Sequence, residues 1–154
     1  MKGNEKVIDA IQNVLTAELI AINQYFLHAE MYESWGLEKL SKQTKIDSIE
    51  EMKHAEKCME RMLYFEGMPN MTKDMRINVG GTVPEMLAHD LQLEYDAVAH
   101  LNKVISVAAE AGDNGTRDMF LLILKDEEEH VDFLETQLSL IEQIGLQNYL
   151  AAQA

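Results

Sequence analysis

The spacing of apolar residues at the start of the chain predicts one long helix. From about residue 4 to residue 35, apolar positions recur every three or four residues, as they do along one face of an α-helix. The members of this stripe are Val7, Ile11, Val14, Ile22, Tyr25 and Ala29. The pair Trp35-Gly36 follows directly, and glycine is common just after a helix ends. We therefore expect a helix over residues 4–35.

A second helix is predicted from about residue 38 to residue 66. It carries a similar apolar stripe and ends before Gly67 and Pro69, which interrupt helical geometry. Residues 67–82 (GMPNMTKDMRINVGGT) then show neither helical nor strand periodicity. A connection this long usually has a structural task. We expect it to cross the length of a helical bundle and to join the second helix to a third that runs parallel to it.

Thr82 is the predicted cap of that third helix. Pro84 then falls in the first turn and Glu85 lies three residues after the cap, which is the usual arrangement of residues at a helix start. The helix is expected to run to about residue 111. Residues 112–115 (GDNG) are expected to form a tight turn.

A fourth helix is predicted over about 116–144, where the periodicity resumes and stops at Gly145. The remaining segment, LQNYLAAQA, is long enough for one or two further turns. The predicted fold class is therefore all-α: two antiparallel helix pairs joined by one long crossover, with a short fifth helix. A chain of 154 residues can bury one sizeable core, so we expect a single domain over residues 1–154.

The composition argues against several functional classes. The chain has 13 basic and 27 acidic side chains and a formal net charge of −14, whereas nucleic-acid binding needs clustered Lys and Arg. No segment approaches the ~20 apolar residues of a membrane span, and charges interrupt the N-terminal segment. The single cysteine, Cys58, excludes an intramolecular disulfide and fits a reducing compartment. We therefore expect a cytoplasmic protein without a membrane or nucleic-acid partner.

Two glutamates occupy positions that belong to the apolar stripes. Glu18 lies between Val14 and Ile22 on the first helix, and Glu94 lies among leucines and valines on the third. An unpaired carboxylate in a core is costly, so it needs a proton, a cationic partner or a metal ion.

The second and fourth helices each carry a glutamate and a histidine three residues apart, on one helix face. These pairs are Glu51 with His54, and Glu127 with His130. The residue numbers of Glu18 and Glu94 differ by 76, and those of the two pairs differ by the same amount. The chain therefore looks like two related hairpins, each with one lone glutamate and one ExxH motif. This is the ligand pattern of di-iron and di-manganese carboxylate bundles, and a solvated acidic face would not explain six polar residues on core stripes.

The ligand chemistry indicates two iron ions. Four carboxylates carry four negative charges, which balance two divalent cations, and oxygen-rich ligation with one imidazole per ion suits Fe(II), with Mn(II) and Zn(II) as competitors. Two glutamates can bridge the ions while the others and the histidines hold each end. The reaction implied is oxidation of Fe(II) to Fe(III) by O₂ or H₂O₂. Tyr25, two turns after Glu18, either braces a ligand or is a buried structural residue.

Several longer stretches carry a family resemblance. They are MKG and KVI near the N-terminus, LIAINQYFLHAEMYESWGL (19–37), SIEEMKHAEK (48–57), ERMLYFEGMPN (60–70), RDM (117–119), DEEEHVDFLETQLSLI (126–141) and GLQNYL (145–150). In this combination the chain resembles the bacterioferritins, the haem-containing ferritins, over essentially its whole length.

This resemblance implies a ferritin-like bundle and an iron-storage ferroxidase. The ferroxidase ligands of the family fall on the six residues already singled out, Glu18, Glu51, His54, Glu94, Glu127 and His130. The resemblance also implies a hollow cage of 24 subunits that stores a ferric mineral, and a small electron-donor protein for iron release. The GLQNYL segment would be the short fifth helix, near the fourfold channels of the cage.

The resemblance further implies haem, as a b-type or related iron porphyrin. Bacterioferritins bind it at twofold subunit interfaces through one methionine from each partner, and Met52 matches that position. Met52 is rotated by about 100° from Glu51 around the helix, so it can leave the bundle and face a second subunit. Asn23 and Phe26 are expected near the porphyrin, whereas Lys45 stands where many members have an aromatic residue.

One position departs from the family in a way that concerns iron. Many members have a histidine where this chain has Ile46, and with an acid at the position of Glu50 it forms an additional iron site on the inner face of the cage. Isoleucine cannot ligate iron, so this additional site is not expected here, and the sequence leaves open whether the catalytic irons stay bound or move inward after oxidation.

Two other functions fit parts of the pattern. One is a di-iron peroxidase like rubrerythrin, although the chain lacks the CxxC pair of the iron–sulfur domain that usually accompanies it. The other is a haem-bearing structural shell whose metal site only stabilises the bundle, and the complete ligand set argues against it. Particle size and the visible spectrum separate these alternatives, because only the storage protein combines a cage with iron and a bis-thioether haem.

Overall fold

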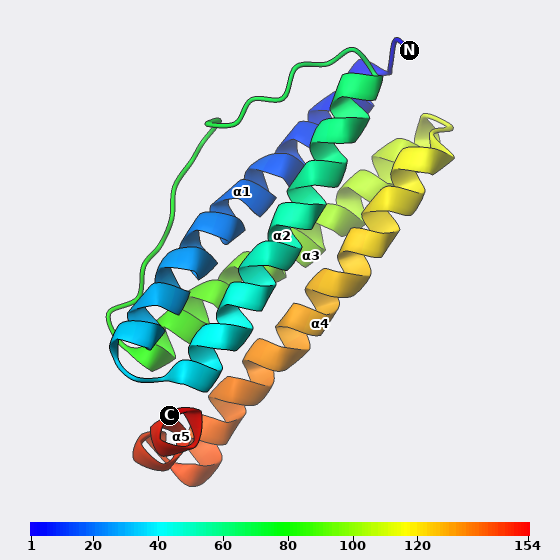
Figure 1. The fold of residues 1–154 in the computed structure, drawn as a ribbon. Helices are drawn as coiled ribbons and strands as arrows, with labels where there is room; N and C mark the ends of the chain where they lie inside the picture. The colour runs from blue at the N-terminus through cyan, green and yellow to red at the C-terminus, as the bar shows by residue number, and fades with distance from the viewer.

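The chain folds almost entirely into helices, and the computed structural model describes all of residues 1–154. The helices are α1 (Glu5–Ser34), α2 (Glu38–Tyr64), α3 (Val83–Glu110), α4 (Asn114–Ile144) and α5 (Leu146–Gln153). The first two form one antiparallel hairpin, α3 and α4 form the other, and the long crossover returns along α1 so that α2 and α3 run in the same direction (Figure 1). The predicted all-α bundle with a long crossover and a short fifth helix is confirmed. None of the five helices is sufficiently long and apolar to cross a membrane.

The apolar core is divided into two clusters by a polar layer. One cluster, which includes Ile11 and Phe120, fills the end of the bundle where α1 begins and α2 ends. The other, which includes Tyr32 and Leu87, fills the opposite end, where α3 begins and α5 packs. The residues between them on all four long helices include buried glutamates and histidines. Apolar packing at both ends therefore fixes the helices on either side of these polar side chains.

The start of α4 differs from the prediction by two residues. The helix begins at Asn114 rather than at 116, because the Asp113 side chain accepts a hydrogen bond from the backbone N–H of Thr116 at 3.0 Å and caps it. Gly115 consequently lies in the first helical turn. A Cβ atom there would stand 2.6 Å from Nη2 of Arg61, which donates to Asp113 at 2.9 Å. The glycine thus permits close approach of the arginine rather than forming a turn.

Local backbone chemistry also sets the two helix ends that flank the crossover. Helix α2 ends at Tyr64, two residues before the predicted end, because Glu66 adopts the left-handed conformation with φ of 62°. Thr82 caps α3 as predicted, since its hydroxyl accepts from the N–H of Glu85 at 3.4 Å. The Glu85 carboxylate reaches back to the N–H of Gly81 at 2.9 Å. Both ends of the crossover are therefore fixed by local backbone chemistry.

A buried polar network holds the end of the crossover against α1 and α3. Gln24 accepts from the backbone N–H of Asn78 at 2.9 Å and donates to Asp90 Oδ1 at 2.8 Å. His28 Nδ1 lies 2.9 Å from the same carboxylate oxygen, and its Nε2 accepts from the N–H of Gly80 at 3.1 Å. Periodicity did not single out Gln24 or His28, although both lie on the buried face of α1.

Helix α5 confirms the predicted short C-terminal helix. It has eight residues and begins after Gly145, whose φ of 82° redirects the chain. The Tyr149 hydroxyl donates to Gln137 Oε1 of α4 at 2.7 Å, with both residues buried. This contact fastens α5 to the bundle end.

Candidate metal centre

The polar layer between the two apolar clusters contains all six residues that the sequence predicts as metal ligands. Glu18 lies on α1, Glu94 on α3, and the two glutamate–histidine pairs on α2 and α4. All six are buried, and their carboxylate and imidazole groups point into one shared space. Helical periodicity explains this placement, because each residue falls on the stripe that its helix turns towards the bundle axis.

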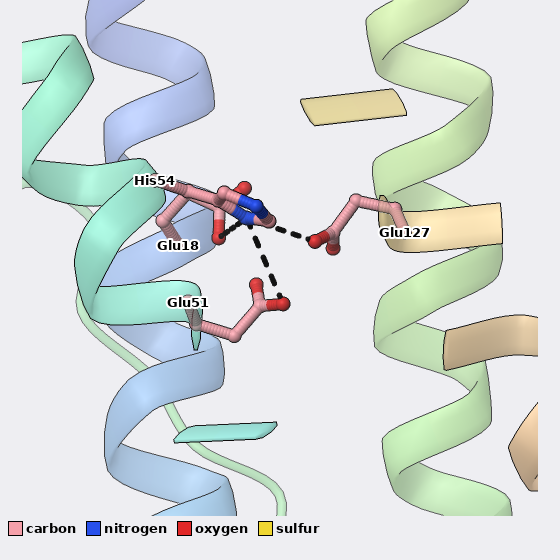
Figure 2. Close-up of side chains that lie close together, drawn as sticks. All are labelled: Glu18, Glu51, His54 and Glu127. Carbon is pink, nitrogen blue, oxygen red and sulfur yellow. Dashed lines mark ion pairs between the residues drawn. The ribbon is translucent and has the colours of Figure 1, made fainter. Parts of the chain in front are cut away.

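The first ligand set gathers around His54. Its Nδ1 lies 3.1 Å from Glu127 Oε1, 3.4 Å from Glu18 Oε2 and 3.8 Å from Glu51 Oε1. Figure 2 shows these carboxylates converging on one imidazole from three helices, α1, α2 and α4. One ligand atom from each of the four residues lies within 4.8 Å of the others.

The second set gathers in the same way around His130. Its Nδ1 lies 2.9 Å from Glu51 Oε1, 3.5 Å from Glu94 Oε1 and 3.7 Å from Glu127 Oε1. Glu51 and Glu127 therefore belong to both sets, whereas Glu18 and Glu94 each belong to one. Two adjacent ion positions that share two carboxylates are the arrangement of a bridged dinuclear centre.

Most of the candidate ligand atoms in this layer lack hydrogen-bond partners. The unsatisfied buried atoms include Glu18 Oε2, both carboxylate oxygens of Glu51, Glu94 Oε2, Glu127 Oε1, and Nδ1 of His54 and His130. Buried polar atoms are normally hydrogen-bonded. These atoms crowd into two small groups without hydrogen-bond partners, so the ligand set fits two cations.

Burial strongly disfavours the charged form of the four glutamates. It raises the pKa of Glu94 to about 8 and that of Glu127 to about 7, with repulsion from neighbouring carboxylates adding to both shifts. The pKa values of Glu18 and Glu51 are raised for the same two reasons. A metal ion that binds here must displace protons from these groups.

The pKa values of the two histidines are raised, which favours their charged form. Burial opposes protonation of His54, but the Glu127 and Glu51 carboxylates outweigh it and raise its pKa to about 9. For His130 the carboxylates of Glu51 and Glu94 likewise overcome burial and raise the pKa. Without a metal ion, protons therefore supply the positive charge that the carboxylates need.

Tyr25 contacts one of the candidate ligands, as the first of the two roles left open by the sequence requires. Its hydroxyl donates a hydrogen bond to Glu94 Oε1. Burial and the charge of Glu94 raise the tyrosine pKa, so the group remains a protonated donor. Its ring also meets the His130 ring edge to face, with 6.5 Å between centroids.

Three carboxylates behind the histidines form an outer layer that the ligand motif does not reveal. Asp126 Oδ2 lies 2.8 Å from Nε2 of His54. On the other side, Glu50 Oε2 lies 3.4 Å and Asp47 Oδ1 3.8 Å from Nε2 of His130. A signal for two of them is present in the sequence, because Glu50 and Asp126 directly precede Glu51 and Glu127 and are related by the same internal repeat.

The residues expected near a porphyrin lie on the outer surface of the α1–α2 hairpin. Met52 is 53% exposed, whereas its neighbour Glu51 is fully buried, so the methionine leaves the bundle interior as predicted. Phe26 is also exposed, and the Lys45 ammonium lies 5.8 Å from its ring centroid. The Asn23 side chain donates to the Leu19 carbonyl at 2.7 Å. Ile46, at the departure from the family pattern, is exposed.

A four-helix bundle with two ExxH motifs and two shared carboxylates defines the class of dinuclear carboxylate proteins. The ferritin-like domain model matches residues 8–144. The chain is 45% identical to a bacterial ferritin of Synechocystis over 154 residues, which cover 99% of each chain. It is 43% identical to the bacterioferritin of Streptomyces coelicolor over 151 residues (98% and 90% of the two chains) and 42% identical to that of Brucella melitensis over 149 residues (97% and 92%). The chain belongs to the bacterioferritin family of iron-storage proteins.

Proposed function

We propose that this protein oxidises Fe(II) to Fe(III) at the dinuclear centre and stores the product as a ferric mineral. The observation that carries this proposal is the pair of buried ligand sets, each with one histidine, which share Glu51 and Glu127. Oxygen-rich ligation with a single imidazole per ion suits Fe(II) as the substrate.

The charges support two substrate ions per chain. Four carboxylates balance two divalent cations, so a pair of Fe(II) ions can enter the low-dielectric layer without a net charge. Each Fe(II) loses one electron. The pair thus supplies the two electrons that, with two protons, convert O₂ to H₂O₂ or H₂O₂ to two molecules of water.

The side chains of the protein hold and orient the substrate. Glu51 and Glu127 each approach both histidines, so they can keep two ions adjacent. Tyr25 holds Glu94 by a hydrogen bond. Carboxylates that give up protons on metal binding leave those protons available for the reduction of the oxidant.

Loss of either end of the centre should slow oxidation. In metal-free protein supplied with Fe(II) in air, Glu18→Ala and His130→Ala should each reduce the initial rate of Fe(III) formation by at least about tenfold, since even a group behind a metal ligand contributes about 10- to 100-fold. Absorbance of Fe(III) follows the reaction. Asp118→Ala, which removes an exposed acid of α4, is the matched control. Wild-type rates in both ligand variants would contradict a ferroxidase role for these residues.

We also propose that the chains assemble into a hollow cage of 24 subunits in the cytoplasm. Near full-length similarity to bacterioferritins supports this, as do exposed apolar side chains on the α1–α2 hairpin, among them Phe26, Ile49 and Met52. Such side chains commonly mark interfaces. Light scattering of the purified protein should give a particle of 24 chains of 17.5 kDa, and a stable dimer would contradict the cage.

A haem group held by Met52 and its twofold counterpart is a further part of the proposal. The thioether of Met52 is exposed on the outer side of the helix that carries Glu51. It therefore fits a symmetric axial ligation between two copies of the chain. A b-type or related iron porphyrin bound there would carry single electrons between a small donor protein and the stored iron.

The haem proposal has a spectroscopic test. Met52→Leu should abolish the Soret band of haem-reconstituted protein while the particle size stays unchanged, because leucine retains the volume but not the thioether. Met68→Leu, at another exposed methionine, should retain the band. A Soret band of wild-type position and intensity in Met52→Leu would assign the haem to another ligand.

A further inference from the structure

The two histidine ligands are each contacted from behind by a carboxylate of the opposite hairpin. Nε2 of His54 on α2 lies 2.8 Å from Asp126 of α4, and Nε2 of His130 on α4 lies 3.4 Å from Glu50 of α2. Both imidazoles turn Nδ1 towards the centre. We propose that Asp126 and Glu50 are crossed positioning residues, which fix the orientation and tautomer of the histidines and make the two half-sites unequal.

The chemistry of the imidazole ring supports this assignment. A neutral imidazole binds a metal ion through one nitrogen and carries its proton on the other, and the partner of that second nitrogen sets the tautomer. An acceptor at Nε2 places the proton there and leaves the Nδ1 lone pair free. Nδ1 is the atom that faces the shared carboxylates, so these outer acceptors select the ligating nitrogen.

The internal repeat of the chain extends to these two residues. The residue numbers of Glu50 and Asp126 differ by the same amount as those of the two ExxH motifs. Each directly precedes a shared glutamate, Glu51 or Glu127, on the same helix. One helix turn therefore supplies a bridging carboxylate to the centre and an outer acceptor to the histidine opposite, which ties the two hairpins together through their ligands.

The two half-sites are not equivalent. His54 has a close outer acceptor, Asp126 at 2.8 Å, whereas His130 has a longer hydrogen bond to Glu50 at 3.4 Å and a second carboxylate, Asp47, at 3.8 Å. The position related to Asp47 by the repeat is Ile123, a buried apolar residue. His54 is therefore held by one close hydrogen bond, and His130 is held by one longer hydrogen bond with a second carboxylate nearby.

The inference rests on the metal centre proposed above, and its test measures metal binding rather than oxidation. Metal-free protein is titrated with Co(II), and its visible absorption bands report the occupancy of each site. Wild-type protein should take up two Co(II) ions per chain. Asp126→Ala should weaken one of them by about 10- to 100-fold, the range found for groups behind metal ligands. Asp126→Asn keeps a neutral acceptor, so its Co(II) affinity should lie between those of the wild type and Asp126→Ala.

The matched variants separate positioning from a general effect of charge. Asp118→Ala removes another acid of α4, two turns before Asp126, and should leave both affinities unchanged. Glu50→Ala should weaken binding of the other Co(II) ion. This loss should be smaller than the loss caused by Asp126→Ala, because Asp47 remains near His130. The double variant Asp47→Ala with Glu50→Ala should lose as much Co(II) affinity at this site as Asp126→Ala loses at the other. Circular dichroism and particle size verify that each variant folds and assembles.

A double-mutant cycle gives the decisive comparison. If Asp126 acts through His54, then Asp126→Ala should have no further effect on Co(II) binding in a His54→Ala background. An undiminished effect in that background would overturn the proposal, as would wild-type affinity for both ions in Asp126→Ala. Failure of the wild-type protein to bind two Co(II) ions would instead contradict the metal centre itself.

Discussion

The four buried glutamates of the centre compete for protons in a space that excludes water. Their carboxylates repel one another, and only His54 and His130 supply positive charge to them when no metal ion is bound. The metal-free layer is therefore held together by shared protons. Metal ions replace those protons, which links binding at the centre to pH.

The stability of the metal-free protein should fall as the pH rises. Burial raises the folded-state pKa of Glu94 to about 8 and of Glu127 to about 7, both above the unfolded value of 4.5, and the carboxylates raise that of His54 to about 9, above 6.5. The folded state thus binds more protons than the unfolded state between pH 4.5 and about 9. Stability is fully present at the lower limit and is lost as the pH rises through these folded-state values.

Thermal unfolding in the presence of a chelator measures this dependence. The unfolding midpoint at pH 9 should be lower than at pH 6, and Glu94→Gln, which removes one titrating group, should reduce the difference. A midpoint that rises over this interval would contradict the proton-sharing description.

At the scale of secondary-structure elements, the crossover is fixed by polar side chains rather than by apolar packing. Gln24 and His28 of α1 satisfy backbone N–H groups of Asn78 and Gly80 and share the Asp90 carboxylate of α3. A segment without regular secondary structure has backbone donors that need partners. These side chains supply them, and they join α1, the crossover and α3.

Removal of the Gln24 amide should loosen the crossover locally. Gln24→Ala leaves the Asn78 N–H and the buried Asp90 carboxylate with one partner fewer, at a cost of about 1–3 kcal/mol. Hydrogen exchange followed by mass spectrometry should show faster exchange over residues 76–82. Gln143→Ala, which removes an exposed amide of α4, should leave the exchange of this segment unchanged. Equal exchange in the Gln24 variant would show that the crossover does not depend on this network.

At the scale of the whole molecule, the candidate centre lies between two apolar clusters, and all four long helices contribute candidate ligands to it. Each cluster packs its own end of the bundle, and the middle layer is cohesive only when its charges are balanced. Cations bound in this layer would therefore connect both hairpins at the level where apolar packing is absent.

Metal binding should raise the stability of the whole bundle. At a free Zn(II) concentration 100 times the dissociation constant, the gain is about 2.7 kcal/mol per site, and each kcal/mol corresponds to roughly 2–4 °C in the unfolding midpoint of a chain this size. Differential scanning calorimetry with and without Zn(II), which undergoes no redox reaction, measures the shift. The double variant Glu18→Ala with His130→Ala should show a much smaller shift, and an equal one would place the stabilising ions elsewhere.

Much of the fold was predictable because it depends on local patterns. Apolar spacing identified all four long helices, Thr82 and Pro84 marked the start of α3, and Gly145 marked the end of α4. The predicted start of α4 was wrong by two residues, because the Asp113 side chain caps the helix and places Gly115 inside its first turn. The predicted end of α2 was two residues too late, because the left-handed conformation that follows the helix is adopted by Glu66 rather than by a glycine.

The sequence by itself determined the helices and the six candidate ligands, because a helix fixes which residues share a face and the internal repeat pairs the faces of the two hairpins. Only the tertiary structure decided that Glu51 and Glu127 are shared by both ligand sets. It also decided that Asp126 contacts His54 while the acceptors of His130 stand further away. The physical reason is that distances between side chains of different helices depend on how those helices pack and rotate. Periodicity within one helix does not determine that packing.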